Sequence, residues 1–272
     1  PPNLRAQPLP WVEPLVLAAS LGNGPMALLL SSVRTAYSGA RSLLAYELVE
    51  SADISDLREL NSLLSQGGQR FLRSWFGYLG YELRHSVERY AEAPPMRFSL
   101  PRGRLMRFST IYEFNHETKQ LVGWSEKPLA LPALIDAPAL PAPPAVLQLC
   151  SPMSRDEYEQ KVARVLEAIA CGDLYQANLT RKFYGEWQTA PAGLSLFSRM
   201  SEVTPAPFSA YLRMADAEIL SSSPELFLSV SEQGRVSTRP IKGTARRGTS
   251  PDEDTQNRAF LQNSDKNRAE NL

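Results

Sequence analysis

One lysine stands out among the residues of this sequence that could do chemistry. Lys242 lies in the stretch Arg239–Thr244 (RPIKGT) at the end of a predicted strand, where Pro240 stiffens the exit and Gly243 lets backbone approach a ligand. Its neighbour is Ile241 rather than an acid. A lysine in a partly desolvated pocket becomes an amine nucleophile. The same spacing also fits a solvated lysine at a strand end, because most lysines are surface residues.

A glutamate at the start of an apolar strand is the second candidate. Glu225 follows Pro224 and precedes the apolar run Leu226–Val230. A carboxyl group in such surroundings could serve as a general acid. An exposed carboxylate at a strand start is the alternative.

Acidic and amide side chains gather at Asp265–Asn271. Asp265 suits the positive end of a helix. Glu270 could bind Mg²⁺, which takes one or two carboxylates together with waters and an anionic substrate. A solvated helix face also fits this local sequence.

The elements that must position these residues are predicted from hydrophobic periodicity and end signals. Ser154 and Glu157 form a capping box for a helix that Gly172 ends. A strand is predicted at Leu174–Phe183, with Gln176 on its polar face. Further strands are expected at 208–214, 218–222, 226–231 and 235–241, and helices are expected to begin after Ser250 and Ser264.

The first half of the chain is predicted to hold short strands within 11–50, a helix over 51–66, a strand at Trp75–Tyr81 and a hairpin over 104–124. A proline-rich stretch without periodicity then divides the chain. We therefore expect an N-terminal region, a linker and a second region, with bounds 1–126, 127–150 and 151–272. A helix followed by mostly antiparallel strands predicts a layered α+β fold.

The composition excludes several classes of protein. The 272 residues carry 29 basic and 29 acidic side chains without basic blocks, which argues against nucleic-acid binding. The sequence contains no apolar run of about 18 residues, so it predicts no membrane-spanning helix. Two cysteines and two histidines argue against a zinc site and fit a reducing compartment, so we expect a cytoplasmic protein.

Four motifs occur in series in the second half: residues 172–180 (GDLYQANLT), 222–225 (SSPE), 238–244 (TRPIKGT) and 266–272 (KNRAENL). This series resembles the chorismate-utilising enzymes, and within them the aminodeoxychorismate synthase component I branch. In the first half, WFGYLGY at Trp75–Tyr81 resembles the glycine–aromatic segment of the same family.

The resemblance implies a large layered α/β sandwich of the anthranilate synthase component I type, with chorismate as substrate, Mg²⁺ as cofactor and ammonia from a glutamine amidotransferase subunit. It implies that Lys242 adds at C2 of chorismate and that Glu225 protonates the departing C4 hydroxyl. The product would be 4-amino-4-deoxychorismate, on the way to p-aminobenzoate and folate. The resemblance also implies that Gln176, Gly243 and Thr244 contact the substrate and that Glu270 is a metal ligand.

Two positions distinguish the branches of this family. Anthranilate synthases carry Ala where this chain has Lys242, and isochorismate and salicylate synthases carry a water-activating Lys where it has Gln176. The resemblance therefore favours aminodeoxychorismate synthesis. The alternatives are an anthranilate synthase component I and a non-catalytic, truncated binding module.

The family pattern continues past Leu272 with further metal and substrate ligands. We therefore expect residues 1–272 to hold only part of an active site. The family also has a tryptophan pocket in its N-terminal region. The pair Ser31–Ser32 falls where a pocket residue would lie, which makes tryptophan binding near Ser32 a hypothesis.

Overall fold

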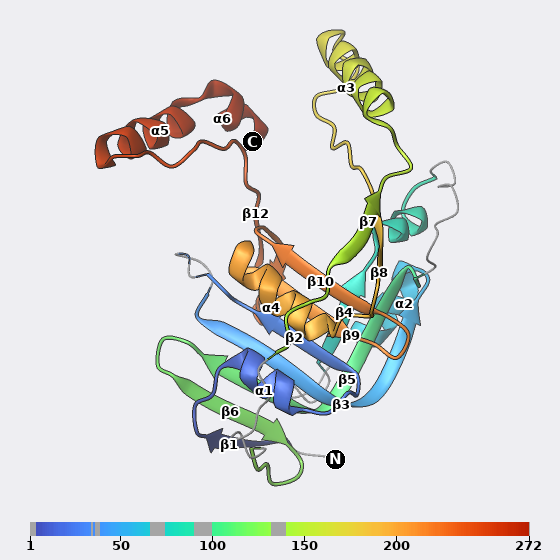
Figure 1. Ribbon diagram of the computed structural model, residues 1–272, viewed down its shortest axis with the longest axis vertical. Helices are drawn as coiled ribbons and strands as arrows, with labels where there is room; N and C mark the ends of the chain where they lie inside the picture. The colour runs from blue at the N-terminus through green and yellow to red at the C-terminus, as the bar shows by residue number, and fades with distance from the viewer. Residues whose placement is uncertain are drawn as a thin grey trace. The chain divides into compact units, whose positions relative to one another are not determined.

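The computed structural model describes residues 4–33, 35, 39–65, 74–89, 100–131 and 140–271 (Figure 1). The chain forms two compact units. One unit combines Pro1–Ala139 with Met200–Leu272, and the other is Leu140–Arg199. These units differ from the expected division at residues 126 and 150, because strands beyond residue 200 pair with strands of the N-terminal region.

An eight-stranded antiparallel sheet forms most of the first unit (Figure 1). Its strand order is β1–β6–β5–β3–β2–β9–β10, and β4 pairs with β5. Because β3 pairs along the whole of β5, β4 and β6 share the other edge of that strand. The bounds are β1 (Arg5–Leu9), β2 (Met26–Leu30), β3 (Arg41–Ile54), β4 (Trp75–Leu79), β5 (Gly103–Asn115), β6 (Gln120–Ser125), β9 (Phe208–Arg213) and β10 (Glu218–Ser223).

The main hydrophobic cluster joins strands from both ends of the chain. Apolar burial is the dominant favourable contribution to folding, so these side chains fix the register of the sheet. Its buried members are Ala27, Ala45, Phe76, Met106, Phe108, Ile111, Leu212 and Met214. A smaller cluster of Ile54, Leu83 and Leu105 packs with Leu60 and Leu63 of α2 (Leu57–Leu64) and with Trp75.

One helix of the first unit lies where strands were predicted. Residues 11–50 contain α1 (Pro14–Ser20) between β1 and β2. Pro14 occupies the first helical turn, where the fixed φ of proline favours a helix start. Leu17 and Ala18 are buried, but seven residues are too few to show a helical period in the sequence. The rest of this unit includes the 3₁₀ helix η1 (Tyr81–Ser86).

The second unit contains α3 (Arg155–Ala170) and a two-stranded sheet of β7 (Val146–Cys150) and β8 (Tyr184–Trp187). The predicted N-cap of α3 is confirmed, because the Ser154 hydroxyl accepts the Glu157 N–H at 3.1 Å, while the Glu157 carboxylate pairs with Lys161 at 3.0 Å. Gly172 ends the helix with a φ of +81°. None of the residues of α3 is buried. The first strand of this unit, β7, lies within the stretch expected to be a linker.

The strand predicted at Leu174–Phe183 is wrong. Residues 174–183 have no regular structure, and pairing begins only at Tyr184. A strand needs a neighbour to satisfy its backbone N–H and C=O groups. Among the described residues, β7 pairs with β8 and leaves 174–183 without a partner strand.

The remaining elements include those that carry the candidate site. They are α4 (Gly193–Val203), β11 (Leu226–Val230), β12 (Val236–Arg239), α5 (Pro251–Asn263) and α6 (Asp265–Asn271). The strands agree with those predicted at 226–231 and 235–241, and both C-terminal helices begin where they were predicted. The predicted α+β class with antiparallel strands is confirmed. In the described part of the chain, no helix has the length and apolar character needed to cross a membrane.

Candidate functional site

A hairpin brings the two principal candidates to one place. The antiparallel pair β11–β12 places Leu226 opposite Arg239. Glu225 directly precedes β11, and Lys242 follows β12 by three residues. The two candidates therefore leave the same end of the hairpin.

Two prolines end the backbone pairing at that point. Continuing the register past Leu226 and Arg239 would set Pro240 opposite Glu225 and Pro224 opposite Ile241. Proline has no N–H and cannot continue the ladder of hydrogen bonds. The Glu225 carboxylate acts as the hydrogen-bond acceptor in place of the backbone, because its Oε2 accepts the Ile241 N–H at 2.8 Å. This bond joins the candidate acid to the residue just before the candidate nucleophile.

Gly243 adopts a backbone conformation that its residue type permits. Its φ is +72°, in the left-handed region. A Cβ at this position would lie 2.5 Å from Oδ1 and 2.6 Å from Cγ of Asn267, on α6. The Asn267 side chain is itself held, since its Nδ2 donates to the Leu261 carbonyl at 3.3 Å. The junction of α5 and α6 thus lies directly over the residue that follows Lys242.

The candidates differ in exposure. Lys242 is half-buried, whereas Glu225, Gly243 and Thr244 are exposed. The proposed acid and the loop around the amine are therefore open to an incoming molecule.

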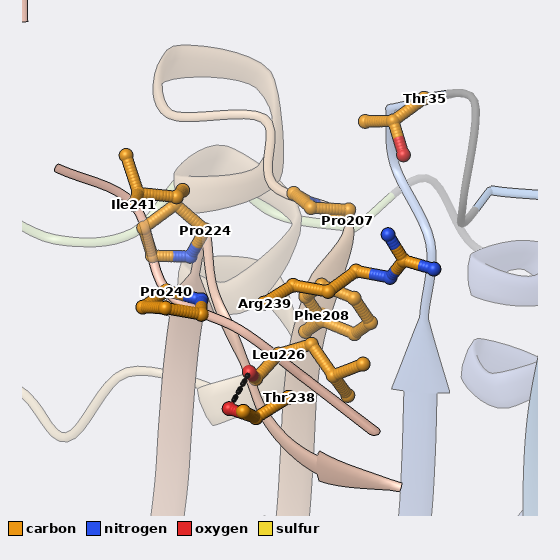
Figure 2. A pocket seen from close by; sticks show the side chains of 9 residues that line it. All are labelled: Thr35, Pro207, Phe208, Pro224, Leu226, Thr238, Arg239, Pro240 and Ile241. Atoms are coloured by element: carbon orange, nitrogen blue, oxygen red, sulfur yellow. Dashed lines mark hydrogen bonds between the residues drawn. The ribbon is translucent and has the colours of Figure 1, made fainter. Parts of the chain in front are cut away.

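A cavity of about 440 Å³ lies beside the hairpin end (Figure 2). Its lining includes Pro224 and Ile241, the chain neighbours of Glu225 and Lys242. Arg239 is the one charged residue among the nine described residues that line it. The other lining residues are Thr35, Pro207, Phe208, Leu226, Thr238 and Pro240. An apolar wall with one guanidinium group suits a ligand that combines a ring with an anionic group.

Ser31 and Ser32 form hydrogen bonds with the segment Ala206–Pro207, which leads into the lining of the same cavity. The Ser32 hydroxyl donates to the Ala206 carbonyl and accepts the Ala206 N–H, each at 2.9 Å. The Ser31 hydroxyl donates to the Pro207 carbonyl at 3.0 Å. Ser32 therefore positions the segment that brings Pro207 and Phe208 to the cavity.

Glu270 lies on α6, half-buried, with its carboxylate 3.8 Å from the ammonium group of Lys266. Mg²⁺ needs several oxygen ligands in a near-octahedral arrangement. In the described residues, no three or more His, Cys, Asp or Glu side chains gather where they could hold a metal ion. Among the described residues, Glu270 is therefore at most one ligand of such a site, and the other ligands would have to come from elsewhere.

Gln176 belongs to the other compact unit, Leu140–Arg199. It is exposed and lies in the irregular stretch 174–183 instead of on the polar face of a strand. The structure thus brings together Glu225, Ile241, Lys242 and Gly243, whereas Gln176 is described only within its own unit.

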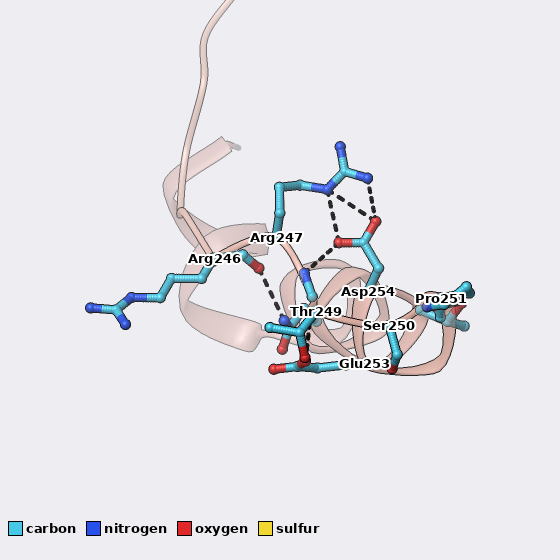
Figure 3. Close-up of polar contacts among 10 residues, drawn as sticks. Arg246, Arg247, Thr249, Ser250, Pro251, Glu253 and Asp254 are labelled. Atoms are coloured by element: carbon cyan, nitrogen blue, oxygen red, sulfur yellow. Dashed lines mark hydrogen bonds and ion pairs between the residues drawn. The ribbon is translucent and has the colours of Figure 1, made fainter.

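A group of polar contacts that the sequence reasoning missed fixes the start of α5 (Figure 3). Arg247 donates to both carboxylate oxygens of Asp254, and the Gly248 N–H donates to the same carboxylate at 2.7 Å. The Arg247 guanidinium and this N–H lower the pKa of Asp254 to about 2. Thr249 bonds to Glu253 in the same turn. Three acids in the first turn of α5 were the available signal.

Comparisons with known proteins agree with the motifs. A family model described as chorismate binding enzyme matches residues 23–272. Aminodeoxychorismate synthase component 1 of Klebsiella aerogenes is 32% identical over 212 residues, which cover 74% of this chain and 45% of that protein. Its counterpart in Salmonella typhimurium strain LT2 is 44% identical over 127 residues, covering 45% of this chain and 26% of that protein. The matched residues span less than half of either relative.

A solved structure shows the same fold. Anthranilate synthase component I from Streptococcus pneumoniae TIGR4 superimposes with a TM-score of 0.68 at 18% sequence identity. The superposition covers 88% of this chain and 60% of the other. At this level of identity, the likeness supports the layered α+β architecture and does not distinguish between reactions.

Proposed function

This chain belongs to the chorismate-binding enzyme family, and we propose that it serves the conversion of chorismate and ammonia to 4-amino-4-deoxychorismate. In this proposal Lys242 is the nucleophile and Glu225 is the general acid. One observation supports it above the others: the Glu225 carboxylate accepts the Ile241 N–H at 2.8 Å. This bond holds a proton donor beside the peptide that carries the amine.

The proposed reaction has two displacements. The neutral Lys242 amine adds at C2, the ring double bonds shift, and the C4 hydroxyl leaves as water with a proton from Glu225. The amine gives up a proton as the C2–N bond forms, which restores the overall proton balance. Ammonia then adds at C4, the double bonds shift back, and the C2–N bond to Lys242 breaks, with the proton that ammonia loses passing to the departing Lys242 amine. Covalent catalysis of this kind divides one difficult displacement into two easier ones.

The other functional groups enter as further parts of the same proposal. Gly243 and Thr244 would contact the substrate, with Gln176 as an additional contact. A glutamine amidotransferase subunit would supply ammonia, for a pathway that leads to p-aminobenzoate and folate. Mg²⁺ would lend charge stabilisation to the substrate, with Glu270 as one of its ligands.

The test is a product assay on the complete natural polypeptide that contains these residues. Chorismate, ammonium and Mg²⁺ are supplied, and products are separated and identified by mass. We expect aminodeoxychorismate from the wild type and a loss of at least about a hundredfold in rate for Lys242→Ala, because the covalent step is removed. Lys127→Ala, at an exposed position outside the four motifs, is the matched control for loss of a lysine. Full activity of Lys242→Ala would exclude the nucleophile assignment.

The same assay separates the alternatives. Anthranilate as the product would identify an anthranilate synthase component I. Saturable binding of chorismate without any product would identify a non-catalytic binding module.

We hold tryptophan binding as a separate hypothesis. Ser32 positions the turn that brings Pro207 and Phe208 to the cavity, and an aromatic ligand would suit that wall. Equilibrium dialysis in which the protein retains no tryptophan would remove this hypothesis.

A further inference from the structure

We propose that Glu225 has a second task, which is to fix the peptide that carries Lys242 through its hydrogen bond to the Ile241 N–H. This inference deepens the proposed function, because it explains how the amine is positioned. Proton transfer and positioning would use different oxygens of one carboxylate.

The need for such a contact follows from the hairpin itself. Pro224 and Pro240 end the β11–β12 ladder, so Ile241 has the first N–H available on the strand that leads to Lys242. Without an acceptor, this segment would leave the hairpin without a fixed direction. The carboxylate of Glu225 supplies that acceptor at 2.8 Å.

A second contact holds the following residue. The Asn267 side chain lies over Gly243, at the place where a Cβ would be. Lys242 therefore lies between one residue that is bonded to Glu225 and another that is covered by Asn267. Fixing the backbone on both sides leaves only the lysine side chain to be ordered when substrate binds, which reduces the entropy lost at that step.

The division of labour within the carboxyl group is chemically consistent. Oε2 accepts the Ile241 N–H, and this oxygen can keep that bond whether or not the other oxygen carries a proton. Oε1 is then the oxygen that gives its proton to the departing hydroxyl. Glu225 can act in both roles during one turnover without releasing Ile241.

Two variants separate the roles. Glu225→Gln keeps an oxygen acceptor of the same length and cannot act as an acid, whereas Glu225→Ala removes both functions. Glu232→Ala, at the exposed tip of the same hairpin, is the matched control. Exchange of the Ile241 amide with deuterated solvent is followed by NMR on the ¹⁵N-labelled chain.

We expect Ile241 exchange to be at least about tenfold faster in Glu225→Ala and within about threefold of wild type in Glu225→Gln and Glu232→Ala. Unchanged exchange in Glu225→Ala would overturn the proposal. So would exchange in Glu225→Gln as fast as in Glu225→Ala. The amides of Val236 and Ser237 show whether the hairpin still forms in each variant.

These readouts need no turnover, so the positioning role could hold while the assay for aminodeoxychorismate fails, and the reverse is equally distinguishable.

Discussion

Gly243→Ala and Gly234→Ala form a matched pair that measures the contact between the Lys242 loop and α6. Both glycines have a left-handed backbone, with φ of +72° at Gly243 and +74° at Gly234. A Cβ at position 234 would meet nothing within 4 Å. A Cβ at position 243 would overlap the Asn267 side chain. The pair thus shares the conformational cost and differs in the overlap.

The expected magnitudes follow from this difference. Alanine in the left-handed region costs about 1–2 kcal/mol at either position. At position 243, the cheapest relief is for Asn267 to rotate and give up its 3.3 Å bond to the Leu261 carbonyl, which adds about 1 kcal/mol. We therefore expect Gly234→Ala to lower the free energy of local opening by about 1–2 kcal/mol and Gly243→Ala to lower it by about 2–3 kcal/mol.

Native-state amide exchange at Val236 and Ile241 measures these local opening energies. The double variant Gly243→Ala with Asn267→Ala should lose less than the sum of its single variants, by about 1 kcal/mol, because the overlap is gone. Equal effects of the two glycine substitutions, or additive effects in the double variant, would refute the reasoning. Either result would mean that α6 does not cover the loop in solution.

Two further substitutions test the sheet and the start of α5. Gly77→Ala should lower the free energy of global unfolding by about 3 kcal/mol, because its Cβ would overlap the Arg104 carbonyl and lie 2.9 Å from the Leu105 Cα. Urea unfolding, followed by Trp fluorescence, measures this free energy. Gly24→Ala is the control, because a Cβ there would make only ordinary contacts. A change below about 0.5 kcal/mol for Gly77→Ala would contradict the β4–β5 register. The lowered pKa of Asp254 means that its contacts with Arg247 and Gly248 stabilise the folded state above about pH 4 and are lost as the pH falls toward 2. The Gly248 amide shift should follow this transition and lose it in Asp254→Asn, and a transition already complete at pH 4 would be the contrary result.

Local signals predicted the elements whose ends are set by neighbouring residues. The helix starts at Ser154 and Ser250 were predicted because an N-cap and its partner lie within three residues of each other. The short helix α1 and the strand at 174–183 were not predicted correctly. Seven residues do not show a helical period, and an alternating pattern does not reveal whether a partner strand exists.

The candidate site was predictable in its residue types and less so in its geometry. The motifs identified Glu225 and Lys242, but the bond from Ile241 to Glu225 depends on the register of β11 against β12. Asn267 contacts Gly243 although α5 lies between them in the sequence, and no local sequence pattern predicts such a contact. The hydrogen bond from Arg247 to Asp254 could not be predicted without knowing the conformation of the turn before α5.

The position of β2 in the sheet has a consequence for how the protein is made. One edge of β2 pairs with β3, which follows soon after it, but the other edge pairs with β9, whose Arg213 is about 190 residues later than Met26. At a ribosome speed of about 5–20 residues per second, that edge waits roughly 10–40 s for its partner. Unpaired strand edges recruit strands of other molecules. The β2 edge of the nascent chain is therefore open to pairing with other molecules until β9 emerges, and a chaperone that covers this edge would protect the chain during that interval.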